Sequence, residues 1–467
     1  MSLTQILAEF GATLRIDDIP KEVRRTARDH VLDTIGVSLA CVDLPYMAIL
    51  ERCSSAPDPR GRSRVLGAGG RYPAQVAALL NGSLSHGNDY DDSFIEGIVH
   101  PSGPVLAAAL AAFDPAIGDG ADLCAAVVAG TEVTCRMALA IGPALLASGV
   151  HPTSACGVLG ATVAAGRAAR LDSGVVADAL AFAASTAGGL HQSTLDGSWN
   201  KRVHGGLAAR AAVMSCELAG AGMRAPRDVL EEGRGLFRTF GVARQVGPEI
   251  DAQLGMRWES AKAAIKVYPA CQGVHPYVDC AIDIHRRDGF DIGDVRSVDL
   301  RVGRKVGLLL CEPREERLRP SNGVAAKFSL PYTVAFALRH GKLTETAFDW
   351  TVPVDEEVFE LSRRVTWEVD PAYDEGMAER GRVDLTTTAG EHITAETPHC
   401  RGTWQNPLST AEVRQKFAAN VGRRLGPAAQ TIIDSVDDLE SQPDLDRVFE
   451  ASLGEPTSSV SATGPAR

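Results

Sequence analysis

The spacing of apolar residues predicts helices through the first 240 residues of the chain. KEVRRTARDHVLDTIGVSLAC, which follows Pro20, carries Val23, Val31, Ile35 and Val37 at roughly helical intervals. Five later segments are apolar almost all round, which is typical of helices buried in a large bundle. They are PSGPVLAAALAAF, ADLCAAVVAGTEVTCRMALAIG, PTSACGVLGATVAAGRAARLD, SGVVADALAFAAS and GGLAARAAVMSCELAGAG. The pattern predicts a large all-helical domain over residues 1–264.

The pattern changes near residue 265. SVDLRVGR and RVTWEV alternate as strands do, and RVDLTTT and EHITAET flank a turn at Ala389-Gly390. AAKFSLPYTVAFALRHG, between them, predicts a helix closed by Gly341. We therefore expect a mainly α protein with a smaller α+β second domain over 265–398. Helical segments over 399–453 are expected to return to the first domain, and the Ser/Gly/Pro-rich tail 454–467 to be disordered.

Composition narrows the classes of partner. The net charge is −12 and the pI about 5.5, which disfavours nucleic acid and anionic membranes as partners. No apolar run free of charge reaches about 18 residues, so no transmembrane helix is expected. The start, MSLTQILAEFGATLRIDD, does not have the pattern of a signal peptide. Ten cysteines without metal-ligand spacing fit a reducing, cytoplasmic environment.

Titratable residues gather in NGSLSHGNDYDDSFIEGIVHPSGP, where His86, Asp89, Asp91, Asp92 and His100 lie between two apolar helices. A metal cage, an acid/base site and a polar turn that caps helices are the alternatives. The stretch lacks the alternating oxygens and the glycine of an EF-hand, and no predicted helix carries an ExxH motif, so no metal site is expected. An aspartate that orients a base or binds a substrate hydroxyl is more economical, with Asp91 and Asp92 structural or capping. His86 and Asp89, three apart, are expected to share a helical face.

Two histidines precede prolines that open apolar helices: His100-Pro101 and His151-Pro152. The helix macrodipole at such a position disfavours the imidazolium ion and keeps the ring neutral, as a general base requires. The same helix ends offer backbone N–H groups to a carboxylate or phosphate. Together they predict an anion site with bases built in.

Basic residues stand at breaks between apolar segments. SWNKRVHGG places Lys201, Arg202 and His204 just before an Ala-rich helix, and SAKAAIKVYPAC places Lys266 before a proline. Cys271 in YPACQGVHP is either a nucleophile near His275 or, with more support, a buried thiol. The chain has no GxSxG elbow, no P-loop and no dinucleotide-binding glycine motif.

Six ordered motifs make the chain resemble the MmgE/PrpD family. They are HGNDYDDS…VHPSGPVLAAALA, HPTSACGVLGATVAAGRAARL, KRVHGGLAARAAVMSCELAGAG, LEEGRGLFRTFG, KVYPACQGVHPYVD and AAKFSLPYTVAFALRHGKL. The resemblance spans about residues 5–450. It implies a large helical bundle domain, a smaller α+β lid domain, a homodimer and a site between the domains without metal or organic cofactor. The family includes 2-methylcitrate dehydratases, cis-aconitate decarboxylases and iminodisuccinate epimerases.

The resemblance also implies roles for individual residues. Asp89 and Ser93 would line the site, and His100 and His151 would share base and acid duties. Lys201 and Lys266 would bind substrate carboxylates, and Tyr332 of FSLPY would reach in from the lid. Arg202, His204, Cys271 and His275 of the same motifs are further candidates for contact with substrate. The family's decarboxylases carry Thr at the position of Ser93 and His at that of Cys271, and the loss of that basic group weakens the decarboxylase interpretation.

The resemblance implies a lyase that removes a proton alpha to a carboxylate of a di- or tricarboxylic acid, a reaction that needs a base and positive charge near the developing enediolate. Dehydration of the 2-methylcitrate dehydratase type, in propionate catabolism, is the first expectation. Epimerisation of an imino- or amino-dicarboxylate and decarboxylation of the cis-aconitate type follow. A non-catalytic dimeric binding protein is the remaining alternative.

Overall fold

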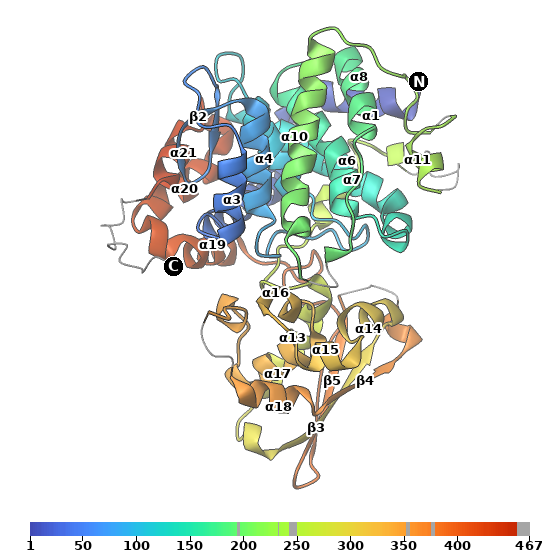
Figure 1. The fold of residues 1–467 in the computed structure, drawn as a ribbon, viewed down its shortest axis with the longest axis vertical. Coiled ribbons are helices and arrows are strands. Elements are labelled where there is room, and N and C mark those ends of the chain that lie inside the picture. Colours follow the sequence, from blue (N-terminus) through green and yellow to red (C-terminus); the bar gives the residue numbers. More distant parts are fainter. Residues whose placement is uncertain (194–196, 232, 242–249, 352–354, 375–378, 455–467) are drawn as a thin grey trace, which may run out of the picture.

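Two bodies of different make-up lie along the long axis of the molecule (Figure 1). The computed structural model describes residues 1–193, 197–231, 233–241, 250–351, 355–374 and 379–454. The larger body is a helical domain, and the smaller body combines helices with a four-stranded sheet. The fold class predicted from the sequence is therefore confirmed. Residues 455–467, which hold nearly all of the predicted disordered tail, lie outside the described residues.

The helical domain is built around two helices that are buried along almost their whole length, α5 (Ser102–Ala112) and α7 (Pro152–Ala168). Small residues allow close contact here, since a Cβ on Gly160 of α7 would lie 2.2 Å from the carbonyl oxygen of Gly130 in α6. The other elements of this domain's first part are α1 (Leu3–Thr13), α2 (Lys21–Ala40), α3 (Pro45–Cys53), β1 (Ser63–Val65), β2 (Ala68–Tyr72), α4 (Ala74–Ser85), α6 (Gly120–Ala147), α8 (Ser173–Ala184), α10 (Asn200–Gly220) and α11 (Leu236–Thr239).

The last helices of the described chain return to the helical domain, as Figure 1 shows in red beside the blue N-terminal helices. They are α19 (Thr410–Leu425), α20 (Ala428–Asp437) and α21 (Asp446–Ser452). Phe417 of α19 packs so closely on Gly36 of α2 that a Cβ there would lie 2.8 Å from its ring. Beside it, Lys416 forms a buried ion pair of 2.7 Å with Asp33 of α2.

The smaller domain, called the lid below, has the strand order β4-β3-β5-β6. Strand β3 (Val295–Val302) pairs in parallel with β4 (Val365–Val369) and antiparallel with β5 (Gly381–Thr387), which pairs with β6 (His392–Thr397). Helices α13 (His275–His285) and α17 (Leu330–His340) share an apolar core with the sheet. The shorter helices are α14 (Arg304–Leu310), α15 (Arg314–Leu318), α16 (Gly323–Ala326) and α18 (Glu356–Ser362).

One predicted lid helix is split. AAKFSLPYTVAFALRHG forms the end of α16 and then α17, because Ser329 turns the chain and caps α17 through its side chain. Gly341 ends α17 in the left-handed conformation at φ 63°, as predicted.

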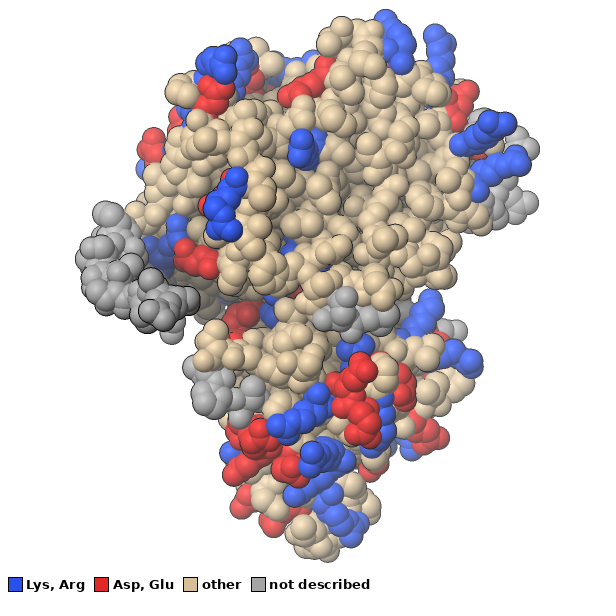
Figure 2. Space-filling model, in the orientation of Figure 1, with Lys and Arg blue, Asp and Glu red and all other residues tan. Residues whose placement is uncertain are grey.

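Charge is distributed unevenly over the surface (Figure 2). In this view the face of the helical domain carries few charged side chains, whereas the lid carries many of both signs. Helix α6 is long and apolar enough to cross a membrane, but 89% of its most apolar window is buried inside the protein. It is therefore a core helix of the bundle.

Candidate active site

The polar stretch between α4 and α5 forms one wall of a pocket and is anchored along its length. Ser93 pairs with Ala264 through two backbone hydrogen bonds of 2.8 and 2.7 Å. The Tyr90 hydroxyl donates to the Val267 carbonyl at 2.9 Å, and Lys416 Nζ donates to the Tyr90 carbonyl at 3.1 Å. The wall is therefore held by both the linking segment near residue 265 and the returning helix α19.

Asp91 and Asp92 have structural roles in this wall. The Asp92 carboxylate accepts hydrogen bonds from the Ser102 backbone N–H and hydroxyl, at 3.2 and 2.6 Å, and lies 2.8 Å from His30 Nδ1. It therefore caps α5, as the capping interpretation predicted. It occupies one of the backbone N–H groups at the α5 N-terminus that were predicted to bind an anion. Asp91 pairs with His86 Nδ1 at 2.6 Å.

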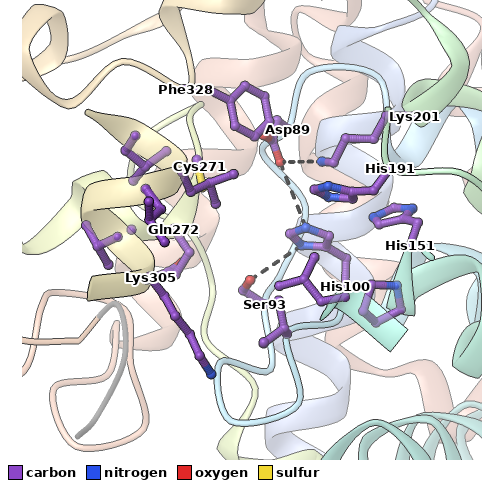
Figure 3. A pocket seen from close by; sticks show the side chains of 18 of the residues that line it. Asp89, Ser93, His100, His151, His191, Lys201, Cys271, Gln272, Lys305 and Phe328 are labelled. Carbon is purple, nitrogen blue, oxygen red and sulfur yellow. Dashed lines mark hydrogen bonds and ion pairs between the residues drawn. The ribbon is translucent and has the colours of Figure 1, made fainter. Parts of the chain in front are cut away.

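Asp89 is the centre of the site (Figure 3). Its Oδ1 accepts hydrogen bonds from Lys201 Nζ at 3.0 Å and from Lys266 Nζ at 2.8 Å, and lies 4.0 Å from His100 Nε2. Burial alone would raise the pKa of Asp89, but the two lysines hold it well below its usual value. Asp89 has φ 54°, a left-handed conformation, and His86 ends α4, so the two do not share a helical face as predicted.

Close packing of glycines brings Lys201 to Asp89. A Cβ on Gly206 of α10 would lie 2.2 Å from the Leu79 carbonyl oxygen of α4, so only glycine allows these two helices to meet there. Lys201 lies in the first turn of α10, not before the helix as predicted, and this contact places it beside the end of α4.

His100 is oriented as a base. Its Nδ1 lies 2.7 Å from the Asp92 carbonyl oxygen, which can only accept, so Nδ1 carries the proton and Nε2 is left with its lone pair. That nitrogen faces Asp89 (Figure 3). Burial, with a further contribution from the lysines, lowers the pKa of His100, so the ring is neutral at pH 7.

A second group of histidines surrounds His151, which is the N-cap residue of α7 as its sequence position predicted. Its Nδ1 lies 3.0 Å from His204 Nδ1, and its ring contacts those of His86 and His191 at centroid distances of 5.5 and 5.3 Å. Burial lowers the pKa of His151 well below its usual value and that of His191 and His204 to about 4. These rings are therefore neutral hydrogen-bonding groups near pH 7.

The pocket between the domains has a volume of about 810 Å³. Its polar lining residues are Asp89, Ser93, Ser148, His100, His151, His191, Gln192, Lys201, Cys271, Gln272 and Lys305. Its apolar lining includes Ile95, Ile98, Leu146, Leu190, Val306, Leu308, Leu309, Leu310 and Phe328. Burial raises the pKa of the Cys271 thiol, so this side chain is neutral and is a poor nucleophile at pH 7.

Five of the predicted site residues do not line the pocket. Lys266 is fully buried behind Asp89, and His204 lies behind His151. The Arg202 guanidinium lies over the Tyr46 ring at 5.3 Å, and His275 is buried with Nε2 3.4 Å from the Ala270 carbonyl oxygen. The expectation that Tyr332 reaches into the site is wrong, because its hydroxyl donates to the Ala347 carbonyl at 2.6 Å inside the lid core.

Several lining residues were not named as candidates from the sequence, among them His191, Gln272, Lys305 and Phe328. Gln272 directly follows Cys271 in a motif already singled out, and Phe328 lies in the FSLPY motif, so both had a signal. His191 and Lys305 lie in segments without any distinctive pattern. In the described part of the chain, no group of three or more His, Cys, Asp or Glu side chains has a metal-binding arrangement.

Comparison with known proteins places this architecture in a family. The model of the MmgE/PrpD N-terminal domain matches residues 5–249, and that of the MmgE/PrpD C-terminal domain matches residues 268–441. The chain belongs to the MmgE/PrpD family. Among its relatives, a cis-aconitate decarboxylase of Aspergillus terreus is 26% identical over 441 residues, covering 90% of this chain and 89% of the relative.

Mammalian relatives are similar over nearly the full length. The cis-aconitate decarboxylase of Mus musculus is 25% identical over 96% of this MmgE/PrpD chain and 93% of the relative. That of Homo sapiens is 26% identical over 100% of this chain and 97% of the relative. The family and these relatives support a lyase-type role.

Proposed function

We propose that the protein is a cofactor-independent lyase that removes a proton alpha to a carboxylate of a di- or tricarboxylic acid and then expels hydroxide as water. The observation that carries the proposal is the cluster at Asp89, where Lys201 and a neutral His100 with its Nε2 unprotonated meet in one pocket. The alpha proton of such a substrate is only weakly acidic. Its removal therefore requires both a base and positive charge near the developing enediolate.

Each residue has a task in this mechanism. His100 Nε2 takes the alpha proton, and the Asp92 carbonyl stabilises the imidazolium through Nδ1–H. Lys201 lies at the pocket surface and binds a substrate carboxylate. Lys266 acts indirectly: its ammonium group is fully buried on Asp89, so it keeps that carboxylate ionised and in place. The His100 imidazolium formed in the first step returns its proton to the departing hydroxyl, and neutral His151, on the neighbouring helix end, can donate a hydrogen bond to that leaving group.

The second candidate is decarboxylation, which the names of the relatives favour. The same cluster supports it, because carbon dioxide loss from an unsaturated tricarboxylate also requires proton transfer at carbon and stabilised negative charge. Against it stands Cys271, a neutral thiol in the pocket where the family's decarboxylases carry histidine. Epimerisation of an imino- or amino-dicarboxylate needs the proton returned from the opposite face, and His151, which lines the same pocket from another helix end, would be the candidate for that step.

Proton NMR in D₂O tests the proposal. The purified protein is incubated with 2-methylcitrate, citrate, cis-aconitate and iminodisuccinate beside a His100→Asn variant. Loss of water, seen as disappearance of the alpha-proton signal and appearance of the unsaturated acid, and absent in the variant, is the expected result. Release of carbon dioxide would indicate that the reaction is decarboxylation and not dehydration. Exchange of the alpha proton without loss of water would favour epimerisation. Four unchanged acids would contradict lyase activity on these substrates.

We also propose that the protein is a homodimer, joined through the helical domain. The support is the face with few charged side chains in Figure 2, since an obligate interface is depleted of charge. Analytical ultracentrifugation should give twice the chain's 49.3 kDa mass. A monomer across the micromolar range would contradict this.

A further inference from the structure

The pocket is larger and more apolar than a small polycarboxylate needs. Its 810 Å³ lies near the upper end of the range of about 300–1,000 Å³ that suits drug-sized ligands. The polar groups that act on carboxylates gather around Asp89, at the helical-domain side (Figure 3). A citrate-sized acid bound there would leave the remaining volume to water.

Most of the remaining lining is apolar and comes from both domains. Residues three and four positions apart share a face of a helix, and α14 of the lid turns Lys305, Leu308 and Leu309 toward the pocket. Leu190 of the helical domain contributes another aliphatic side chain to the same lining. Leu308 is 67% exposed and Leu190 is 70% exposed. Leucine side chains are mostly buried in folded proteins, so two such exposed leucines in the lining of one pocket are unusual.

These walls discriminate between substrate classes. A carboxylate pressed against leucine side chains would lose its hydration without gaining a hydrogen bond, which is unfavourable. An alkyl chain in the same place would bury both its own surface and that of the exposed leucines. The pocket is thus matched to an amphiphilic acid, with carboxylates at one end and a chain at the other.

We propose that the substrate is a di- or tricarboxylic acid that carries an apolar chain of several carbons, bound with its carboxylates at Lys201 and its chain between Leu308 and Leu190. This inference rests on the proposed function and names the substrate class of the same site. Burial of one methylene group favours binding by a factor of about four, so a chain of four to six carbons should dominate selectivity.

A chain-length series tests the inference. Citrates substituted at carbon 2 with methyl, butyl or hexyl groups are compared as substrates by kcat/KM. The equivalent alkyl tricarballylates, which lack the hydroxyl and are not dehydrated, are compared by calorimetric Kd. Both quantities should improve about fourfold per methylene. Equal values for methyl and hexyl compounds, or a preference for methyl, would overturn the inference.

Variants locate the chain. Leu308→Ser and Leu190→Ser change exposed positions and should fold, and each should reduce the methyl-to-hexyl ratio of Kd values by about tenfold. Leu453→Ser is the matched control, because this leucine is also exposed, at 40%, but lies at the end of α21, away from the pocket lining. Ratios in the two pocket variants that match the control would also overturn the inference.

The two proposals fail differently. If the tricarballylates bind more tightly with each methylene but no citrate reacts, the lyase proposal fails while the apolar chain site stands. If 2-methylcitrate reacts as well as its hexyl homologue, the lyase proposal stands and the chain site fails.

Discussion

The two domains contribute unlike walls to one pocket. On the helical side, Asp89 and Lys266 are buried, His100 is half-buried, and all three are joined by hydrogen bonds to each other or to backbone carbonyls. On the lid side, Lys305 and Leu308 of a two-turn helix are exposed. Groups that must keep fixed pKa values and positions lie in the rigid bundle, whereas groups that select a substrate lie on a surface that can vary without unfolding the protein. We expect substitutions on the two walls to have different effects.

Asp89→Asn, on the helical side of the pocket, should reduce both stability and activity more than any other substitution considered. It leaves the buried Lys266 ammonium without its partner, which costs about 3–5 kcal/mol of folding stability, and it should lower kcat by about 10³-fold or more. Chemical denaturation and initial rates measure both effects. The double variant Asp89→Asn/Lys266→Met should regain much of the stability but none of the activity. Asp58→Asn, which removes an exposed ion pair with Arg60, is the control and should change neither.

His100→Asn should affect chemistry without affecting the fold. Loss of the base should reduce alpha-proton exchange by about 10² to 10⁴-fold. Binding of a tricarballylate should be retained within a few fold, because Lys201 is unchanged. His399→Asn in the lid, where the ring is exposed and distant from the pocket lining, serves as control. Unaltered exchange in His100→Asn would exclude this residue as the base.

Lowering the pH should destabilise the histidine-rich helical side of the pocket. Folding lowers the pKa of His191 and His204 to about 4, mainly through burial, whereas the unfolded chain titrates near 6.5. The unfolded state therefore binds more protons between these values, and stability falls as pH drops from 6.5 towards 4. Thermal unfolding should show Tm decreasing over this window. His204→Gln should reduce the decrease, and an identical decrease in that variant would contradict its assignment to these rings.

Lys305→Met on the lid wall should have the smallest effect. An exposed ammonium at the pocket mouth adds a screened attraction for an anionic substrate, so KM should rise a few fold, more at low salt, with kcat unchanged. Arg304→Met on the same helix, also exposed but not a lining residue, should leave KM unchanged. A large loss of kcat in Lys305→Met would place chemistry on the lid and remove the contrast between the walls.

The sequence predicted the features that depend on local pattern. Helical periodicity, the change to alternation near residue 265, and prolines at helix starts were enough to predict the domains' character and the positions of His100 and His151. Pairings between distant segments could not be inferred in this way. Nothing near Lys266 indicates that its partner is Asp89, and Tyr332 belongs to a motif yet packs in the lid core, because tertiary contacts decide where such a side chain points.

The contacts of Lys416 determine when the site can be completed during synthesis of the chain. It lies in a helix near the end of the described chain, but its ammonium group holds the Tyr90 carbonyl and pairs with Asp33. A nascent chain that ends after the lid still lacks these contacts, so Asp33 is without Lys416 as its partner. The contacts of Lys416 join segments that lie far apart in the sequence. The site can therefore be completed only after the last helices have left the ribosome.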